Sequence, residues 1–97
     1  MIKLSETGKD LIEGIPRKTT KNFLKTLLNK EEILEIKKNE MNQNFDLIHF
    51  FNNIESSIDL NIFIISIYKD VRLNVKEESE LEIRNKIYQN IFNILNF

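Results

Sequence analysis

The sequence contains no cysteine and only one histidine, His49, and these two shortages exclude much of the chemistry that small enzymes use. Without thiols the chain can form no disulfide, thiolate nucleophile or thiolate metal site. A Ser-His-Asp triad would have to use His49, but no serine lies in a G-x-S-x-G motif. A zinc site would need mostly carboxylate ligands, which is uncommon. We therefore expect no enzyme activity and no bound metal, and we interpret His49 as hydrogen-bonded locally on its helix.

Glycine and proline are almost as scarce, with two glycines and one proline, all within the first sixteen residues. Two glycines cannot supply a Walker or dinucleotide-binding pattern, so we expect no nucleotide cofactor. No apolar run approaches the roughly 18 residues that cross a bilayer. Residues 1–15 carry acids and a glycine where a signal peptide would be continuously apolar. The sequence therefore predicts a cytoplasmic protein that has no cofactor and no contact with membranes.

The composition is otherwise that of an ordinary globular protein. Hydrophobic residues make up 41% of the chain and charged residues 30%. A length of 97 residues is enough for one modest core, so we expect a single helical-bundle domain over residues 1–97. The net charge of −1 offers no bulk attraction to nucleic acid.

Apolar residues at helical spacing predict six helices joined by short connections. With so few glycines and prolines, the boundaries have to be set by N-cap residues, and the best capping box pairs Ser79 with Glu82. The other predicted N-caps are Thr7, Asn29, Asn44 and Asp59. The predicted helices cover about residues 7–15, 19–28, 29–38, 44–56, 59–70 and 79–95.

The segment DLNIFIISIYKD, residues 59–70, is apolar on almost every side. A helix of that kind needs neighbours over most of its surface, so we expect it to be the central helix of an all-α antiparallel bundle. The alternative is an α+β fold with a hairpin at about residues 62–75, because isoleucine favours strands. Lys69-Asp70 is not a glycine-containing hairpin turn, and no further strands are evident to complete a sheet. The helix is therefore favoured.

The charge is distributed unequally along the chain. Residues 1–38 hold nine basic and six acidic residues, a balance of +3, whereas residues 39–97 hold five basic and nine acidic residues, a balance of −4. We interpret the glutamates at 31, 32, 35, 77, 78, 80 and 82 as stabilising helix N-termini and solvating an outer face. The predicted basic patch comprises Arg17, Lys18, Lys21 and Lys25. The predicted acidic patch comprises Asp46, Glu55 and Asp59, with the Glu77–Glu82 run as a further candidate.

Opposite patches could join one copy of the chain to the next. Such a heterologous contact does not close on itself, and its repetition gives an open filament.

Five segments follow one another over roughly residues 9–73: DLIEGIP, FLKTLLNK, EEILEI, NFDLIHFFNNIES and DLNIFIISIYKD. Their order resembles the caspase-recruitment branch of the death-domain superfamily, a six-helix antiparallel Greek-key bundle. The likeness is one of pattern, and the chain departs from it in a short connection before the third helix and a long final helix. It implies a non-enzymatic adaptor that recruits a partner of the same fold through charged patches.

The leading functional hypothesis is thus a protein–protein interaction module that assembles by homotypic contact, in signalling or defence. The first alternative is a small viral or bacterial regulator that binds and inhibits an unrelated protein. The second is a weak nucleic-acid binder that uses the lysines of the basic patch, although the negative net charge opposes it.

Overall fold

The computed structural model describes residues 4–71 and 79–96, and within those ranges it contains six helices and no strand. The predicted all-α six-helix bundle is therefore confirmed. The alternative hairpin at residues 62–75 is wrong for the part described, which is helical up to Val71; residues 72–75 lie outside the described ranges. The helices are α1 (Leu4–Glu13), α2 (Lys18–Leu27), α3 (Lys30–Lys38), α4 (Leu47–Asn53), α5 (Ser57–Val71) and α6 (Glu80–Leu95).

Two of the predicted N-caps are confirmed. The Glu32 backbone N–H donates to Asn29 Oδ1 at 2.8 Å, and the Asn29 backbone N–H donates to Glu32 Oε1 at 3.0 Å, which completes a capping box for α3. Ser79 caps α6 by accepting the Glu82 backbone N–H at 3.2 Å. A polar side chain three residues before a glutamate was thus a reliable signal wherever an apolar run followed.

Three predicted N-caps are wrong. Thr7 is buried within α1, because that helix begins earlier, at Leu4. Asp46, not Asn44, caps α4 by accepting the His49 backbone N–H at 3.0 Å. Asp59 lies in the first turn of α5, which begins two residues earlier at Ser57. At α4 the error is a shift of two residues between two polar side chains that both cap well, and in α1 and α5 the helix begins two or three residues before the predicted cap.

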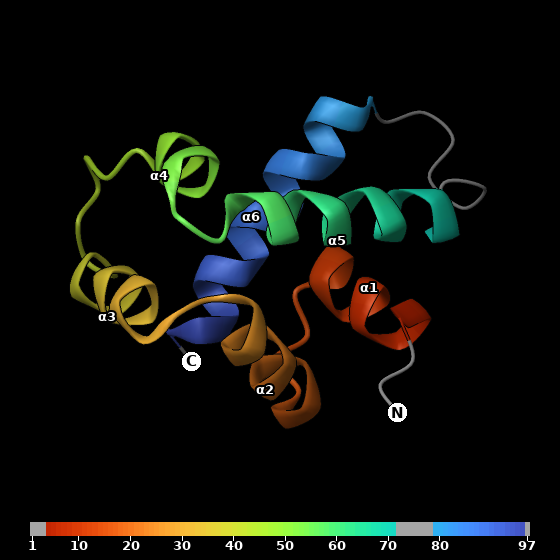
Figure 1. Cartoon of the computed structure of the whole chain (residues 1–97), viewed down its shortest axis with the longest axis horizontal. Coiled ribbons are helices and arrows are strands. Elements are labelled where there is room, and N and C mark those ends of the chain that lie inside the picture. Colours follow the sequence, from red (N-terminus) through yellow and green to blue (C-terminus); the bar gives the residue numbers. More distant parts are fainter. Residues whose placement is uncertain (1–3, 72–78, 97) are drawn as a thin grey trace.

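Helix α6 is the centre of the bundle. It packs against each of the other five helices, and Figure 1 shows it crossing α5 and ending between α2 and α3. Among its exposed residues, Glu82, Lys86, Gln89 and Asn93 form a polar stripe at helical spacing, and much of the rest of the helix is apolar. Its buried residues are Ile83, Ile87, Tyr88, Ile91, Ile94 and Leu95.

The prediction that residues 59–70 form the central helix is wrong. One side of α5 is buried against α1, α4 and α6, through Leu60, Phe63, Ile64 and Ile67. The Phe63 ring also contacts the Phe23 ring of α2, with centroids 4.8 Å apart. The other side stays uncovered, since Ile58 is 72% exposed and Ile62 58% exposed. Helix α5 therefore lies at the edge of the bundle and presents apolar side chains outward.

A side chain of α6 binds backbone carbonyl groups in the last turn of α1. Gly14 has φ +76°, a left-handed conformation that glycine adopts without the steric penalty of a Cβ. The Asn90 side-chain amide of α6 donates to the carbonyl oxygens of Leu11 and Ile12. These contacts hold α1 against the central helix.

Candidate interaction surfaces

The described residues show no arrangement typical of a metal or membrane site. Among residues 4–71 and 79–96, no three metal-ligating side chains come together. None of the helices in those ranges combines the length and the apolar character that crossing a bilayer demands. His49 is exposed, and its Nδ1 lies 3.2 Å from Asn53 Nδ2 one turn along α4. The predicted local hydrogen bond of His49 is thus confirmed.

Arg17, the first member of the predicted basic patch, is paired within the chain. Its Nε lies 3.3 Å from Asp10 Oδ1, and the Asp10 side chain is almost fully buried in α1. The hydroxyl of Thr20 donates to the other carboxylate oxygen of Asp10 at 2.6 Å. Because a buried carboxylate needs such partners, Arg17 contributes to the corner between α1 and α2. The uncompensated positive charge of the patch must therefore come from lysines.

Those lysines lie on α2, which contains no acidic residue. Lys18 and Lys25 are exposed, and neither forms an ion pair with any residue in the described ranges. Lys21 is half-buried and already interacts within the chain. Asn22 is exposed between them, and Lys18, Asn22 and Lys25 follow the i, i+4, i+7 spacing of one helix side. We call these three residues the α2 basic face.

The predicted acidic patch is divided between the two ends of α4. Asp46 is exposed at its beginning, where it caps the helix. Glu55 lies in the connection after it, and Asp59 follows in the first turn of α5; both are exposed. Glu77 and Glu78 of the further acidic run lie outside the described residues, whereas Glu80 and Glu82 are in the first turn of α6. The structure thus places Glu55 and Asp59 together at the α4–α5 junction.

Glu32 fixes that junction, contrary to the prediction that it solvates an outer face. Its side chain is only 7% exposed, and it accepts hydrogen bonds from the Ser56 hydroxyl at 2.7 Å and the Ser56 backbone N–H at 3.2 Å. Together with the Asn29 N–H it therefore has three donors. The predicted role of Glu32 at a helix N-terminus is confirmed by the capping box, but its predicted solvation is wrong, because the Glu32–Ser56 contact joins residues 24 positions apart, which no local pattern reveals.

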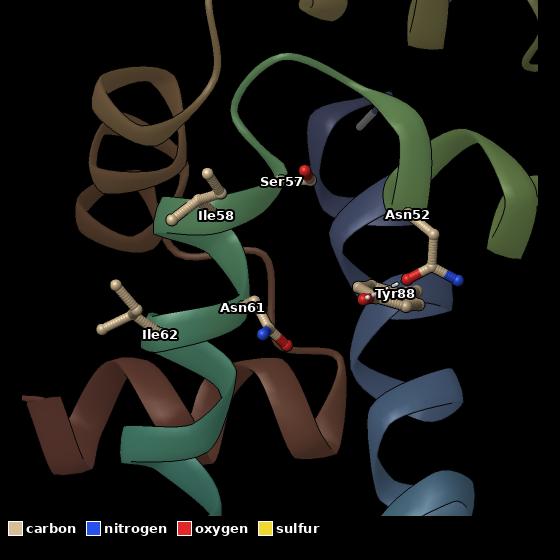
Figure 2. Close-up of a pocket in the computed structure, with 6 residues that line it drawn as sticks. All are labelled: Asn52, Ser57, Ile58, Asn61, Ile62 and Tyr88. Carbon is tan, nitrogen blue, oxygen red and sulfur yellow. Dashed lines mark hydrogen bonds between the residues drawn. The ribbon is translucent and has the colours of Figure 1, made fainter.

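A groove of about 260 Å³ runs between α4, α5 and α6. Figure 2 shows Asn61 of α5 on the side that faces Tyr88 of α6, whereas Ile58 and Ile62 project from α5 away from Tyr88. The Tyr88 ring stacks on Phe51, with centroids 4.9 Å apart and planes 11° from parallel. The six lining residues are Asn52, Ser57, Ile58, Asn61, Ile62 and Tyr88.

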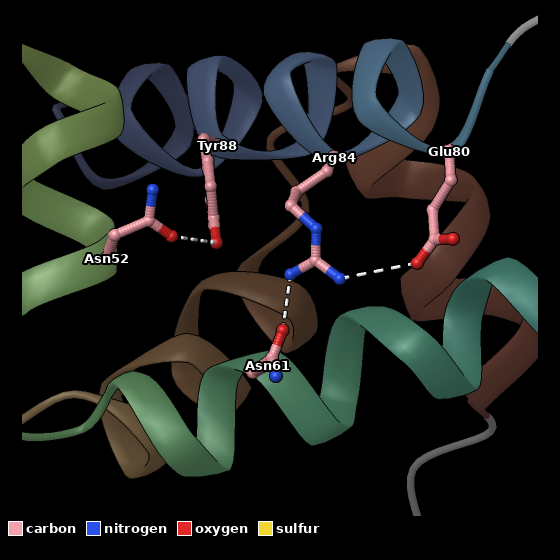
Figure 3. Close-up of polar contacts among 5 residues, drawn as sticks. All are labelled: Asn52, Asn61, Glu80, Arg84 and Tyr88. Carbon is pink, nitrogen blue, oxygen red and sulfur yellow. Dashed lines mark hydrogen bonds and ion pairs between the residues drawn. The ribbon is translucent and has the colours of Figure 1, made fainter.

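Two asparagine side chains in the groove have their orientation set by neighbours on α6. The Tyr88 hydroxyl donates to Asn52 Oδ1 at 3.2 Å, and Arg84 donates to Asn61 Oδ1. Arg84 is itself held by Glu80, one turn earlier, at 3.5 Å, as Figure 3 shows. Since both amide oxygens are engaged, the Nδ2 groups of Asn52 and Asn61 are the parts left to donate to a partner.

The groove was not anticipated from the sequence. Ile62 belongs to the segment 59–70, which was expected to be covered on most sides, whereas Ile58 lies just before that segment and was given no role. Ile58 and Ile62 are one helical turn apart, and a third exposed position on the same helix, Asp59, lies beside them. A signal was available: the apolar stretch is wider than one helix side needs, so some of it had to be exposed unless α5 was central.

Comparison with known proteins assigns no family. No protein-family model matches the chain, no curated protein matches its sequence, and no solved structure matches its fold. The resemblance to the caspase-recruitment branch, including its Greek-key topology, therefore stays a prediction, and the functional argument has to come from this chain's own surfaces.

Proposed function

We propose that this protein is a non-enzymatic interaction module that binds another copy of itself, or a partner of the same fold, through surfaces of opposite charge. The observation that carries the proposal is the separation of charge between elements. Helix α2 carries lysines and no acid, whereas the exposed side chains of Asp46, Glu55 and Asp59 flank α4. Signalling or defence as the setting, and the cytoplasm as the location, belong to the same proposal.

The exposed charges affect mainly how fast two copies of the chain meet and how they are oriented when they do. A single exposed ion pair contributes only about 0–1 kcal/mol, so no one pair holds two copies together. Several pairs of complementary sign raise the association rate and suppress wrong orientations. Their effect falls as salt is added, because the Debye length shortens to about 8 Å at 0.15 M ionic strength. Self-association should therefore be strong at low salt and weak at high salt.

The basic and acidic surfaces belong to different helices, so a contact between them joins unlike surfaces. The joined pair then keeps one free basic surface and one free acidic surface, each available to a further copy. Contacts of this type propagate unless their rotation closes a ring. We therefore expect the assembly to grow with protein concentration.

Light scattering coupled to size-exclusion chromatography, over a range of protein and salt concentrations, tests the proposal. The average mass should rise with protein concentration at low salt and fall to that of the monomer at high salt. A monomer at every concentration and salt, with no binding to a same-fold partner, would refute self-association. A mass that stops at the dimer would refute open growth.

Charge reversal gives a sharper test. The double variants Lys18→Glu/Lys25→Glu and Glu55→Lys/Asp59→Lys should each lose self-association, because each leaves like charges facing one another. Mixed together, the two variants should associate, because the native acidic surface of the first meets the native α2 lysines of the second, and the substituted surfaces are also of opposite charge. Failure of the mixture to associate, while both variants stay folded by circular dichroism, would contradict the pairing of these surfaces.

A further inference from the structure

We propose that the groove between α4, α5 and α6 receives the α2 basic face of a second copy. This inference rests on the self-association proposed above and deepens it by naming the two surfaces that meet. The groove is the receiving side, and Lys18, Asn22 and Lys25 are the entering side.

The chemistry of the groove edge favours a lysine-bearing occupant. Ile58 and Ile62 are among the most exposed large apolar side chains in the described part of the chain, and the acids Glu55 and Asp59 lie at the same junction. A purely apolar ligand would cover the isoleucines and leave nearby carboxylates without a partner. A lysine side chain meets both needs, because its four-carbon stem packs on apolar surface while its ammonium group reaches a carboxylate.

The spacing of the α2 basic face fits this edge. Four residues separate Ile58 from Ile62, a rise of about 6 Å along α5. Seven residues separate Lys18 from Lys25, a rise of about 10 Å along α2. The two lysines therefore span the isoleucine pair, and the ammonium group at the Ile58 end can extend toward Glu55 or Asp59, which both lie at that end.

The polar side of the groove can hydrogen-bond to Asn22, the residue between Lys18 and Lys25 in the α2 basic face. Asn52 and Asn61 present amide Nδ2 donors, because their Oδ1 atoms are engaged by Tyr88 and Arg84. Asn22 is exposed on α2 and carries a side-chain carbonyl that can accept from such a donor.

The receiving surface is held in place before any partner binds. Tyr88 is fixed by its stack on Phe51, and Arg84 is fixed between Asn61 and Glu80. The Glu32–Ser56 hydrogen bonds hold the junction from the other side. A pre-formed surface loses little conformational entropy on binding, which favours association.

The first test replaces the isoleucines and leaves every charge in place. The variant Ile58→Ser/Ile62→Ser should self-associate at least tenfold more weakly than the wild type in sedimentation at low salt. The matched control is Leu81→Ser, because Leu81 is 66% exposed on α6 and does not line the groove. Its self-association should be unchanged. Circular dichroism and urea unfolding check that both variants keep the fold.

The outcomes separate this inference from the proposed function. If the wild type does not self-associate, both fail. If the wild type self-associates and charge reversal abolishes it, but Ile58→Ser/Ile62→Ser has no effect, the proposed function stands and the groove is not the receiving surface. A loss of self-association in Leu81→Ser equal to that in the groove variant would also overturn the assignment.

The second test locates the contact directly and exploits the absence of native cysteine. Mixing Asn22→Cys with Ile62→Cys under mild oxidation should give a mixed disulfide between two chains, identified by mass. Mixing Asn22→Cys with Leu81→Cys should give only the background level. Equal yields from the two mixtures would refute docking of α2 on the groove.

Discussion

Helices α5 and α6 have similar apolar content and opposite positions in the bundle. Nine of the fifteen residues of α5 are apolar or aromatic, compared with eight of sixteen in α6. Yet α6 packs against every other helix, while α5 leaves Ile58 and Ile62 exposed. Apolar content therefore did not decide which helix became central. What distinguishes α6 is that six of its eight apolar residues are buried, and that its polar residues Arg84 and Asn90 also contact neighbouring helices.

The same contrast bears on function. Protein surfaces normally carry isolated apolar side chains, but neighbouring ones that rim a groove often mark a binding site. The apolar residues of α5 that exceed what its buried side needs are those at the groove edge. The helix that was expected to lie in the core is thus the one on which we propose the receiving surface.

The largest effect is expected at the buried side of α5. Phe63→Ala should lower the free energy of unfolding by about 3–5 kcal/mol, because the Phe63 ring fills the space between α5 and the Phe23 ring of α2. Urea denaturation measures the loss. An unchanged unfolding midpoint would mean that α5 contributes little to the core on either side.

The comparison of the two helices is sharpened by making the same substitution on each. Ile87→Ala on α6 should cost about 3 kcal/mol, because Ile87 is completely buried at the centre of the bundle. Ile62→Ala on α5 should change stability by no more than about 0.5 kcal/mol, because Ile62 is largely exposed. Equal losses in urea unfolding would overturn the assignment of α6 as the central helix.

The start of α5 should depend on a polar contact as well as on packing. Glu32→Ala should cost about 2 kcal/mol, because it removes the acceptor for the Ser56 and Asn29 donors. The neighbouring Glu31→Ala is the matched control, and it should be nearly neutral because Glu31 is exposed. Thermal unfolding of the two variants under identical conditions measures the difference. If they unfold at the same temperature, the Glu32 contact does not secure the junction.

A further, moderate effect is expected where α1 meets α6. Gly14→Ala should cost about 1–2 kcal/mol, because the position has a left-handed φ and an added Cβ would lie 3.1 Å from Asn90 Oδ1. Gly8→Ala is the comparison, since Gly8 lies within α1, where alanine favours the helix by up to about 1 kcal/mol. Crowding opposes that gain, because a Cβ added at Gly8 would lie 3.1 Å from the Ile67 side chain. A smaller loss in Gly14→Ala than in Gly8→Ala, measured by urea unfolding, would contradict this account.

The local elements could be predicted from the sequence, because helix periodicity and capping depend on residues a few positions apart. The segments carrying α2, α3 and α6 were placed within about two residues of their observed bounds, and the Asn29–Glu32 box was found. The candidate surfaces were predicted less well. The lysines of α2 are exposed as expected, but the pairing of Arg17 with Asp10 and the whole groove were missed.

The sequence by itself determined an all-helical chain, the approximate helix bounds and the separation of basic from acidic residues. Only the tertiary structure decided that α6 is central, that α5 exposes two isoleucines, and that Glu32 and Arg17 act within the fold. The physical reason is the separation along the sequence between the residues that decide each feature. A helix turn or a cap is specified by residues three or four apart, whereas the burial of a side chain depends on which distant segments pack against it. Small differences among many such contacts decide that arrangement.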